Sequence, residues 1–143
     1  MSGTDPAASA MAQDRDRLVR QVSDAVRARD IPLATDLARG ALERGLVHPL
    51  FLGLRAFWFD DQGRTREALA DIETAIGLAP QDAPLRNSHG QILSSAGRWD
   101  EAVEAFERCV ALRPDFAPAY RNLGYARQGI GDLRGSAQAF EQA

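Results

Sequence analysis

The sequence predicts an all-α protein in which antiparallel helical hairpins stack side by side into a solenoid. The main observation is a repeat of 34 residues: Gly63, Gly97 and Gly131 follow one another at that spacing, and Pro80 and Pro114 keep the same step. Internal repetition at a period of this size is typical of solenoids made from small supersecondary units. A second observation is that apolar residues recur at helical spacing on both sides of each repeated glycine.

Each unit reads as two helices joined by a tight turn. Apolar-periodic segments of about 13 residues flank the glycine of the turn, and a proline closes the second segment. A small residue in each helix, such as Gly90 in the first and Ala102 in the second, allows the two axes to approach closely. Large residues such as Leu93 and Phe106 then fill the space beside them. The pattern predicts helices at about 15–28, 32–44, 49–62, 65–78, 83–96, 99–112, 117–130 and 133–142.

The chain resembles the tetratricopeptide repeat family in its period, its small-residue positions, its glycine turn and its closing proline. The resemblance covers repeats 49–82 and 83–116 and an incomplete repeat 117–143, inside a repeat domain spanning 14–143. It implies a right-handed superhelix with one concave face. Residues 1–13 are small and polar, and we expect a disordered lead there.

The unit at 15–48 fits the pattern only loosely. Arg29 stands where later units have the turn glycine, and Leu46 stands where they have proline. Two interpretations remain open: a degenerate first repeat, or an unrelated helical pair that caps the N-terminal end.

Three consecutive aromatic residues, Phe57, Trp58 and Phe59, cannot share one face of a helix, because successive side chains diverge by about 100°. By its alignment with Leu93, Phe59 is expected to pack within its own hairpin, and Trp58 to face the second helix of the preceding unit. Phe57 then lies on the concave face, with Gln91 and Tyr125 at the equivalent positions. It contacts a ligand, is shielded by the N-terminal segment, or is tolerated as a single exposed apolar residue.

The resemblance implies a partner-binding groove along the concave face. The expected groove residues are Leu50, Phe57, Asp60, Asp61, Asn87, Gln91, Ser94, Ser95, Arg121, Asn122, Tyr125 and Gln128. They offer an acidic end, a neutral hydrogen-bonding middle and a cationic, aromatic end, which suits an extended or helical peptide. The groove departs from the family's chaperone-tail clamps, which hold a terminal carboxylate with several Lys, Arg and Asn. Arg121 and Asn122 lie together, but Asn87 and Ser88 occupy the matching sites one repeat earlier.

Composition excludes several classes of function. The net charge is −3, and the 17 basic residues, all arginine, are scattered among acidic ones, so no nucleic-acid or anionic-membrane partner is expected. Arginine-only usage suggests a GC-rich bacterial genome. No stretch reaches the length of a membrane span, and the first residues do not resemble a secretory signal, so a cytoplasmic location is expected.

No group of residues suggests catalysis. Cys109 is the single cysteine and is expected to act as a small buried hydrophobe. Two histidines, His48 and His89, make a poor metal site, so neither a metal nor a cofactor is expected. His89 shares its repeat position with Arg55. Either the two form a polar network with a nearby carboxylate, or they are partly exposed packing residues.

The sequence therefore favours a non-catalytic interaction module, a scaffold or adaptor that binds a protein or peptide in its groove. An alternative is the N-terminal module of a larger bacterial enzyme, such as a sulfotransferase, glycosyltransferase or hydroxylase, because the last helix carries no polar capping helix. A third possibility is self-association through that uncapped C-terminal helix.

Overall fold

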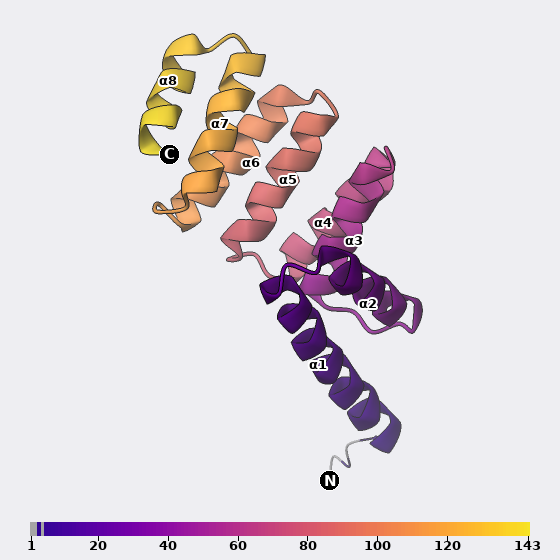
Figure 1. The fold of residues 1–143 in the computed structure, drawn as a ribbon. Coiled ribbons are helices and arrows are strands. Elements are labelled where there is room, and N and C mark those ends of the chain that lie inside the picture. Colours follow the sequence, from indigo (N-terminus) through magenta and orange to yellow (C-terminus); the bar gives the residue numbers. More distant parts are fainter. Residues whose placement is uncertain (1–2, 4) are drawn as a thin grey trace.

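The computed structural model describes residue 3 and residues 5–143, and it consists of eight α-helices without a strand in these residues (Figure 1). The helices are α1 (Pro6–Arg27), α2 (Ile31–Glu43), α3 (Pro49–Asp61), α4 (Thr65–Leu78), α5 (Ala83–Ser95), α6 (Trp99–Leu112), α7 (Ala117–Gly129) and α8 (Leu133–Gln142). The prediction of an all-α solenoid of antiparallel hairpins is confirmed. In the described part of the chain, none of the helices has the length and apolarity that crossing a bilayer requires.

The four hairpins follow one another along a single axis. Figure 1 shows the pairs from α1 and α2 at the bottom to α7 and α8 at the top, with the two termini at opposite ends. Each hairpin packs against the next through its second helix, so that α2 contacts α3, α4 contacts α5 and α6 contacts α7. Among the first helices of the hairpins, α5 also contacts α3 on one side and α7 on the other, and the three form one continuous surface, called here the first-helix face.

Helix α1 begins earlier than the sequence analysis expects. The Asp5 carboxylate accepts a hydrogen bond from the Ala7 N–H at 3.1 Å, and Pro6 occupies the first turn, where a missing N–H costs nothing. Alanine-rich sequence then favours continuation of the helix. The expectation of a disordered lead over 1–13 is therefore wrong from Pro6 onward. Residues 1, 2 and 4 lie outside the described residues, and the division into repeats stays a prediction.

Each hairpin turns at a residue in the left-handed conformation. Gly63, Gly97 and Gly131 have φ values of 73°, 73° and 82°, and Arg29 takes the same role in the first hairpin with φ 60°. In every case the next N–H bonds back to the carbonyl five residues earlier, as Arg64 does to Phe59 at 2.8 Å. This pattern satisfies carbonyls that the end of a helix leaves unpaired. The first hairpin thus has the turn of the later ones, although it lacks their glycine.

Within the hairpins, a small residue on the first helix lies against a large residue on the second. The ring of Phe106 covers Gly90 so closely that a Cβ at Gly90 would overlap it, and Phe140 covers Gly124 in the same way. Phe106 is 1% exposed. These contacts set the distance between the two helix axes.

Helix α3 is buried on more than one side because it belongs to two cores. Phe51 packs in an N-terminal core with residues of α1 and α2, whereas Leu52 and Ala56 belong to a core that extends through α8. Leu42 of α2 packs against both cores. The unusually apolar sequence of α3 follows from this position between the first hairpin and the rest of the solenoid.

Replacement of Gly90 by alanine is expected to lower the free energy of unfolding by about 1–3 kcal/mol, because the added methyl group overpacks the contact with Phe106. Gly40→Ala provides a matched control, since a Cβ at Gly40 meets nothing within 4 Å. That control is expected to stabilise the protein by about 0.5–1 kcal/mol. Urea unfolding followed by circular dichroism measures both variants. A Gly90→Ala protein as stable as wild type would contradict the close-packing argument.

Candidate functional site

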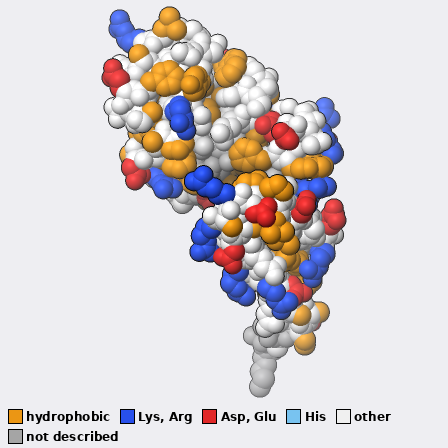
Figure 2. All heavy atoms as spheres, viewed as in Figure 1, with side chains coloured by type: hydrophobic (Ala, Val, Ile, Leu, Met, Phe, Trp, Pro, Cys, Tyr) orange, Lys and Arg blue, Asp and Glu red, His pale blue; other side chains and the backbone are white. Residues whose placement is uncertain are grey.

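The residues expected to line a groove all lie on the three helices of the first-helix face. Helix α3 carries Leu50, Phe57, Asp60 and Asp61, helix α5 carries Asn87, Gln91, Ser94 and Ser95, and helix α7 carries Arg121, Asn122, Tyr125 and Gln128. Because α3, α5 and α7 are neighbours, the fold gathers these residues from a span of more than two repeats. Figure 2 shows hydrophobic side chains in separate patches, with acidic and basic side chains among them.

The three consecutive aromatic residues of α3 have three different surroundings. Phe57 is exposed to 41%. Trp58 meets the second helix of the preceding hairpin, where the guanidinium carbon of Arg39 lies 3.8 Å from the centre of its ring. Phe59 packs against the main core, and Arg64 covers it at 4.6 Å. Phe57 is thus the most exposed of the three, whereas Trp58 and Phe59 are half-buried.

The same repeat position as Phe57 is occupied by Gln91 on α5 and by Tyr125 on α7, so the three side chains form a row across the first helices. Gln91 is half-buried, and Tyr125 is exposed to 57%, with its ring edge-on to Phe140 at 5.1 Å between centroids. Two aromatic rings with a carboxamide between them can contact a partner with little loss of conformational freedom, because each ring has few rotatable bonds.

Several polar residues of the predicted groove are engaged with neighbouring repeats. The Ser95 hydroxyl lies within hydrogen-bond distance of an Asp60 carboxylate oxygen at 3.2 Å and of the Gln91 carbonyl at 3.1 Å, and Asn122 Nδ2 donates to Asn87 Oδ1 at 3.0 Å. Asn87 is only 9% exposed. These bonds tie α3 to α5 and α5 to α7, so the four side chains help to set the spacing of the first helices. The half-buried Leu50 likewise packs against the N-terminal core.

A pocket of about 630 Å³ lies beside Phe57, between the start of α2 and the exposed side of α3. Its lining residues are Ile31, Pro32, Thr35, Asp36, Phe57, Trp58 and Asp61. The sequence analysis identifies only the Phe57 and Asp61 part of this site. An apolar residue at the start of a helix, Ile31, is the one feature of the α2 sequence that could have pointed to this pocket. The closeness of the α2 residues to Phe57 depends on how the two helices pack.

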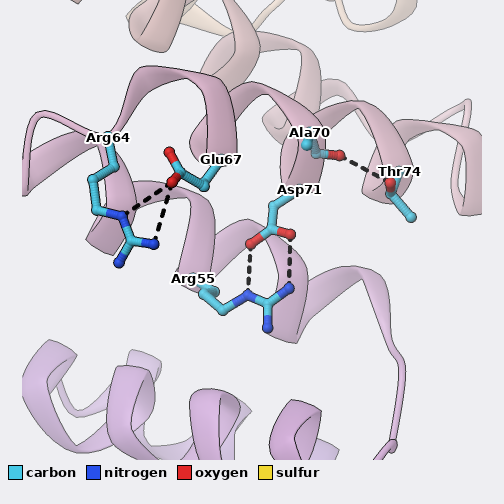
Figure 3. Close-up of polar contacts among 6 residues, drawn as sticks. All are labelled: Arg55, Arg64, Glu67, Ala70, Asp71 and Thr74. Atoms are coloured by element: carbon cyan, nitrogen blue, oxygen red, sulfur yellow. Dashed lines mark hydrogen bonds and ion pairs between the residues drawn. The ribbon is translucent and has the colours of Figure 1, made fainter.

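Arg55 and Asp71 form an ion pair inside the hairpin α3–α4 (Figure 3). Arg55 Nε and Nη2 donate to the two carboxylate oxygens at 2.7 and 2.8 Å, and Asp71 is 7% exposed. The hydrogen bonds to Asp71 raise the pKa of the Arg55 guanidinium. One repeat later, His89 Nε2 lies 3.8 Å from a Glu73 carboxylate oxygen. The expected contact with a nearby carboxylate is confirmed at Arg55, whereas the 3.8 Å between His89 and Glu73 exceeds hydrogen-bond length and no bond joins the two positions.

The remaining candidates for chemistry are also structural. His48 precedes α3 and its Nδ1 accepts a hydrogen bond from the Leu50 N–H at 3.1 Å, so it caps that helix. Cys109 is fully buried, its thiol donates to the Ala83 carbonyl at 3.2 Å, and burial raises the pKa of the thiol. No cluster of three or more His, Cys, Asp or Glu residues suited to a metal occurs among the residues described.

Comparison with known proteins identifies similar folds. A family model described as TPR repeat matches residues 90–131. Among solved structures, the MamA protein has a TM-score of 0.72 at 19% identity, with 94% of this chain and 73% of that chain covered. The pilF protein of Pseudomonas aeruginosa has a TM-score of 0.75 at 18% identity, covering 93% and 61%. The second TPR of Spaghetti (RPAP3), bound to the HSP90 peptide SRMEEVD, has a TM-score of 0.63 at 20% identity, covering 66% and 88%. No curated protein sequence matches the chain.

Loss of Arg55 alone is expected to destabilise the protein more than loss of the whole ion pair. Arg55→Leu leaves the buried Asp71 carboxylate uncompensated and should cost about 2–3 kcal/mol of unfolding free energy. The double variant Arg55→Leu, Asp71→Ala introduces the pair that the last hairpin, α7–α8, already has at these positions, Leu123 and Ala139, both of which are buried. We expect it to recover most of the loss in a denaturant titration. Equal stability of the single and double variants would contradict a compensated buried charge.

Acidification below neutral pH should destabilise the fold through its two histidines. Burial is the largest cause that lowers the pKa of both His48 and His89 from the ordinary value of 6.5. The unfolded chain therefore binds more protons than the folded chain as the pH falls below that value, and the free energy of unfolding falls with the pH. The slope is at most about 1.4 kcal/mol per pH unit for each histidine.

Thermal unfolding between pH 7.5 and 5.5, a window above the ordinary carboxylate pKa values, measures this effect. The double variant His48→Asn, His89→Leu keeps an acceptor at the cap of α3 and an apolar group in the core. Its stability should depend less on pH than that of the wild type. An unchanged slope of stability against pH would rule out the histidines as the source of the pH dependence.

Proposed function

We propose that this chain is a non-catalytic interaction module that binds a partner segment on its first-helix face. Its fold is that of tetratricopeptide repeat proteins, and its residues 90–131 match the TPR repeat. The observation that carries the proposal is the row of Phe57, Gln91 and Tyr125. These residues occupy one repeat position on three adjacent helices, and both aromatic rings are exposed.

Phe57 and Tyr125 leave 41% and 57% of their surface exposed to water, although the rings of Tyr125 and Phe140 contact each other in a T-shaped pair. Aromatic residues are enriched among those that dominate the binding energy of protein interfaces. A row of such residues along adjacent helices suits a linear segment that crosses the hairpins.

Polar side chains beside this row can supply specificity. Asp61 lies toward the N-terminal end, Ser94 in the middle, and the exposed Arg121 and Gln128 on α7. The surface changes from acidic to basic along the stack, so it distinguishes the two orientations of a charged segment.

Similar structures support a peptide as the partner class. Both the first and the second TPR of Spaghetti (RPAP3) are described as bound to the HSP90 peptide SRMEEVD, and the similar YrrB structure as having an unusual peptide-binding site. YrrB shares 20% identity over 85% of this chain. The partner here is expected to differ from an acidic chaperone tail, because this face carries Asp60 and Asp61 and only one arginine among its proposed contact residues.

Affinity capture from a lysate of the source cells tests the proposal. The bait is the wild-type chain beside a triple variant, Phe57→Ala, Gln91→Ala, Tyr125→Ala, which removes two exposed rings and one half-buried carboxamide and should leave the protein folded. A control triple, Leu78→Ala, Glu104→Ala, Leu112→Ala, removes a comparable set of exposed side chains from the second helices α4 and α6.

We expect mass spectrometry to identify proteins retained by wild type and by the control and lost from the first variant. The same proteins on all three baits, or none, would contradict binding through the first-helix face. A large stability loss in Phe57→Ala alone would show that Phe57 belongs to the core.

A further inference from the structure

The pocket between α2 and α3 combines apolar walls with acidic groups. Ile31, Pro32, Phe57 and Trp58 provide the apolar surface, and Ile31 and Phe57 are exposed to 48% and 41%. Asp36 of α2 and Asp61 of α3 line the same pocket. Such a site fits a side chain that has an apolar stem and a positive end.

One of the two carboxylates is left without a charge partner in the described part of the chain. The Asp36 Oδ1 atom lies 3.9 Å from Arg39 Nη1, which is the outer limit for an ion pair. Asp61 forms neither an ion pair nor a side-chain hydrogen bond with any described residue. A cation entering the pocket would therefore find an uncompensated negative charge beside the Phe57 ring.

Thr35 adds a hydroxyl to the pocket lining. The residue is 9% exposed, and its hydroxyl makes no hydrogen bond with any described residue and remains accessible to solvent. By contrast, Thr74, which is also in a helix, bonds its hydroxyl to the Ala70 carbonyl at 2.8 Å (Figure 3). A solvent-accessible hydroxyl that lines a pocket can exchange its water for a polar group of a ligand.

The chain already binds one guanidinium by the same chemistry. Arg39 lies over the Trp58 ring at 3.8 Å from guanidinium carbon to ring centre, and it approaches the Asp36 carboxylate. The Trp58 ring thus already holds a guanidinium group of the chain itself. Phe57 and Asp61, four residues apart on the same face of α3, offer an aromatic ring and a carboxylate to a second cation.

We propose that this pocket receives an arginine side chain of the partner segment, an inference that rests on the proposed function and specifies its partner. Arginine fits better than lysine because its planar group stacks on an aromatic ring while its N–H groups reach a carboxylate and a hydroxyl at once. An acidic side chain would be repelled by Asp36 and Asp61, and a purely apolar one would make no use of their charge.

A titration of the ¹⁵N-labelled full chain with N-acetyl-arginine methylamide, followed by NMR, tests the pocket directly. The neutral isostere N-acetyl-citrulline methylamide is the control ligand. We expect arginine-induced shifts at Thr35, Asp36, Asp61 and the Trp58 indole, with citrulline binding weaker by about tenfold. Asp61→Asn should weaken arginine binding by about fivefold, and added salt should weaken it further. Glu104→Gln removes the same charge from the exposed side of α6 and should change nothing.

Equal binding of the two ligands, shifts elsewhere on the surface, or an unchanged affinity in Asp61→Asn would each overturn the inference. The outcome is distinguishable from failure of the proposed function. A partner captured through Phe57, Gln91 and Tyr125 without arginine selectivity in the pocket overturns this inference alone. Arginine selectivity without a captured partner overturns the proposed function and leaves the site itself established.

Discussion

The close approach of the two helices in each hairpin is the constraint on which the rest of the structure depends. Phe106 covers Gly90 and Phe140 covers Gly124, and neither contact leaves room for a Cβ on the first helix. In the preceding hairpin Ala56 takes the glycine position, and its core partner is the smaller Ile72, so the sum of the two sizes is kept. Because every first helix is held at a similar distance from its second helix, α3, α5 and α7 come into register and form one surface.

Local signals made most of the fold predictable. Seven of the eight predicted helices begin and end within one residue of the observed limits, because a glycine in the left-handed conformation and a closing proline mark the same points in each repeat. The start of α1 was not predictable in this way, since Asp5 and Pro6 lie before the repeated pattern and act as an ordinary helix start. Arg29 shows the converse case, in which an unfavourable residue still adopts the turn because the hairpin around it requires it.

The candidate site was predictable only in part, because repeat position determines the face of a residue and not its partners. The outward position of Phe57 followed from the alignment of repeats. The bond from Asn122 to Asn87 did not, since it joins residues 35 apart and depends on the exact spacing of α5 and α7. The contribution of α2 to the pocket was missed for the same reason: Thr35 and Phe57 belong to different units, and only the packing of the first hairpin on α3 brings them together.

The position of α3 has a thermodynamic consequence. This helix shares Phe51 with the core of the first hairpin and Ala56 with the core of the others, and its exposed side completes the pocket with α2. A ligand in that pocket contacts two elements that meet only when the first hairpin is docked. By mass action it therefore lowers the population in which α1 and α2 detach, as slower amide hydrogen exchange in these helices would report. Ligand binding in this pocket and the docking of the N-terminal hairpin on α3 are thus thermodynamically linked, so each one favours the other.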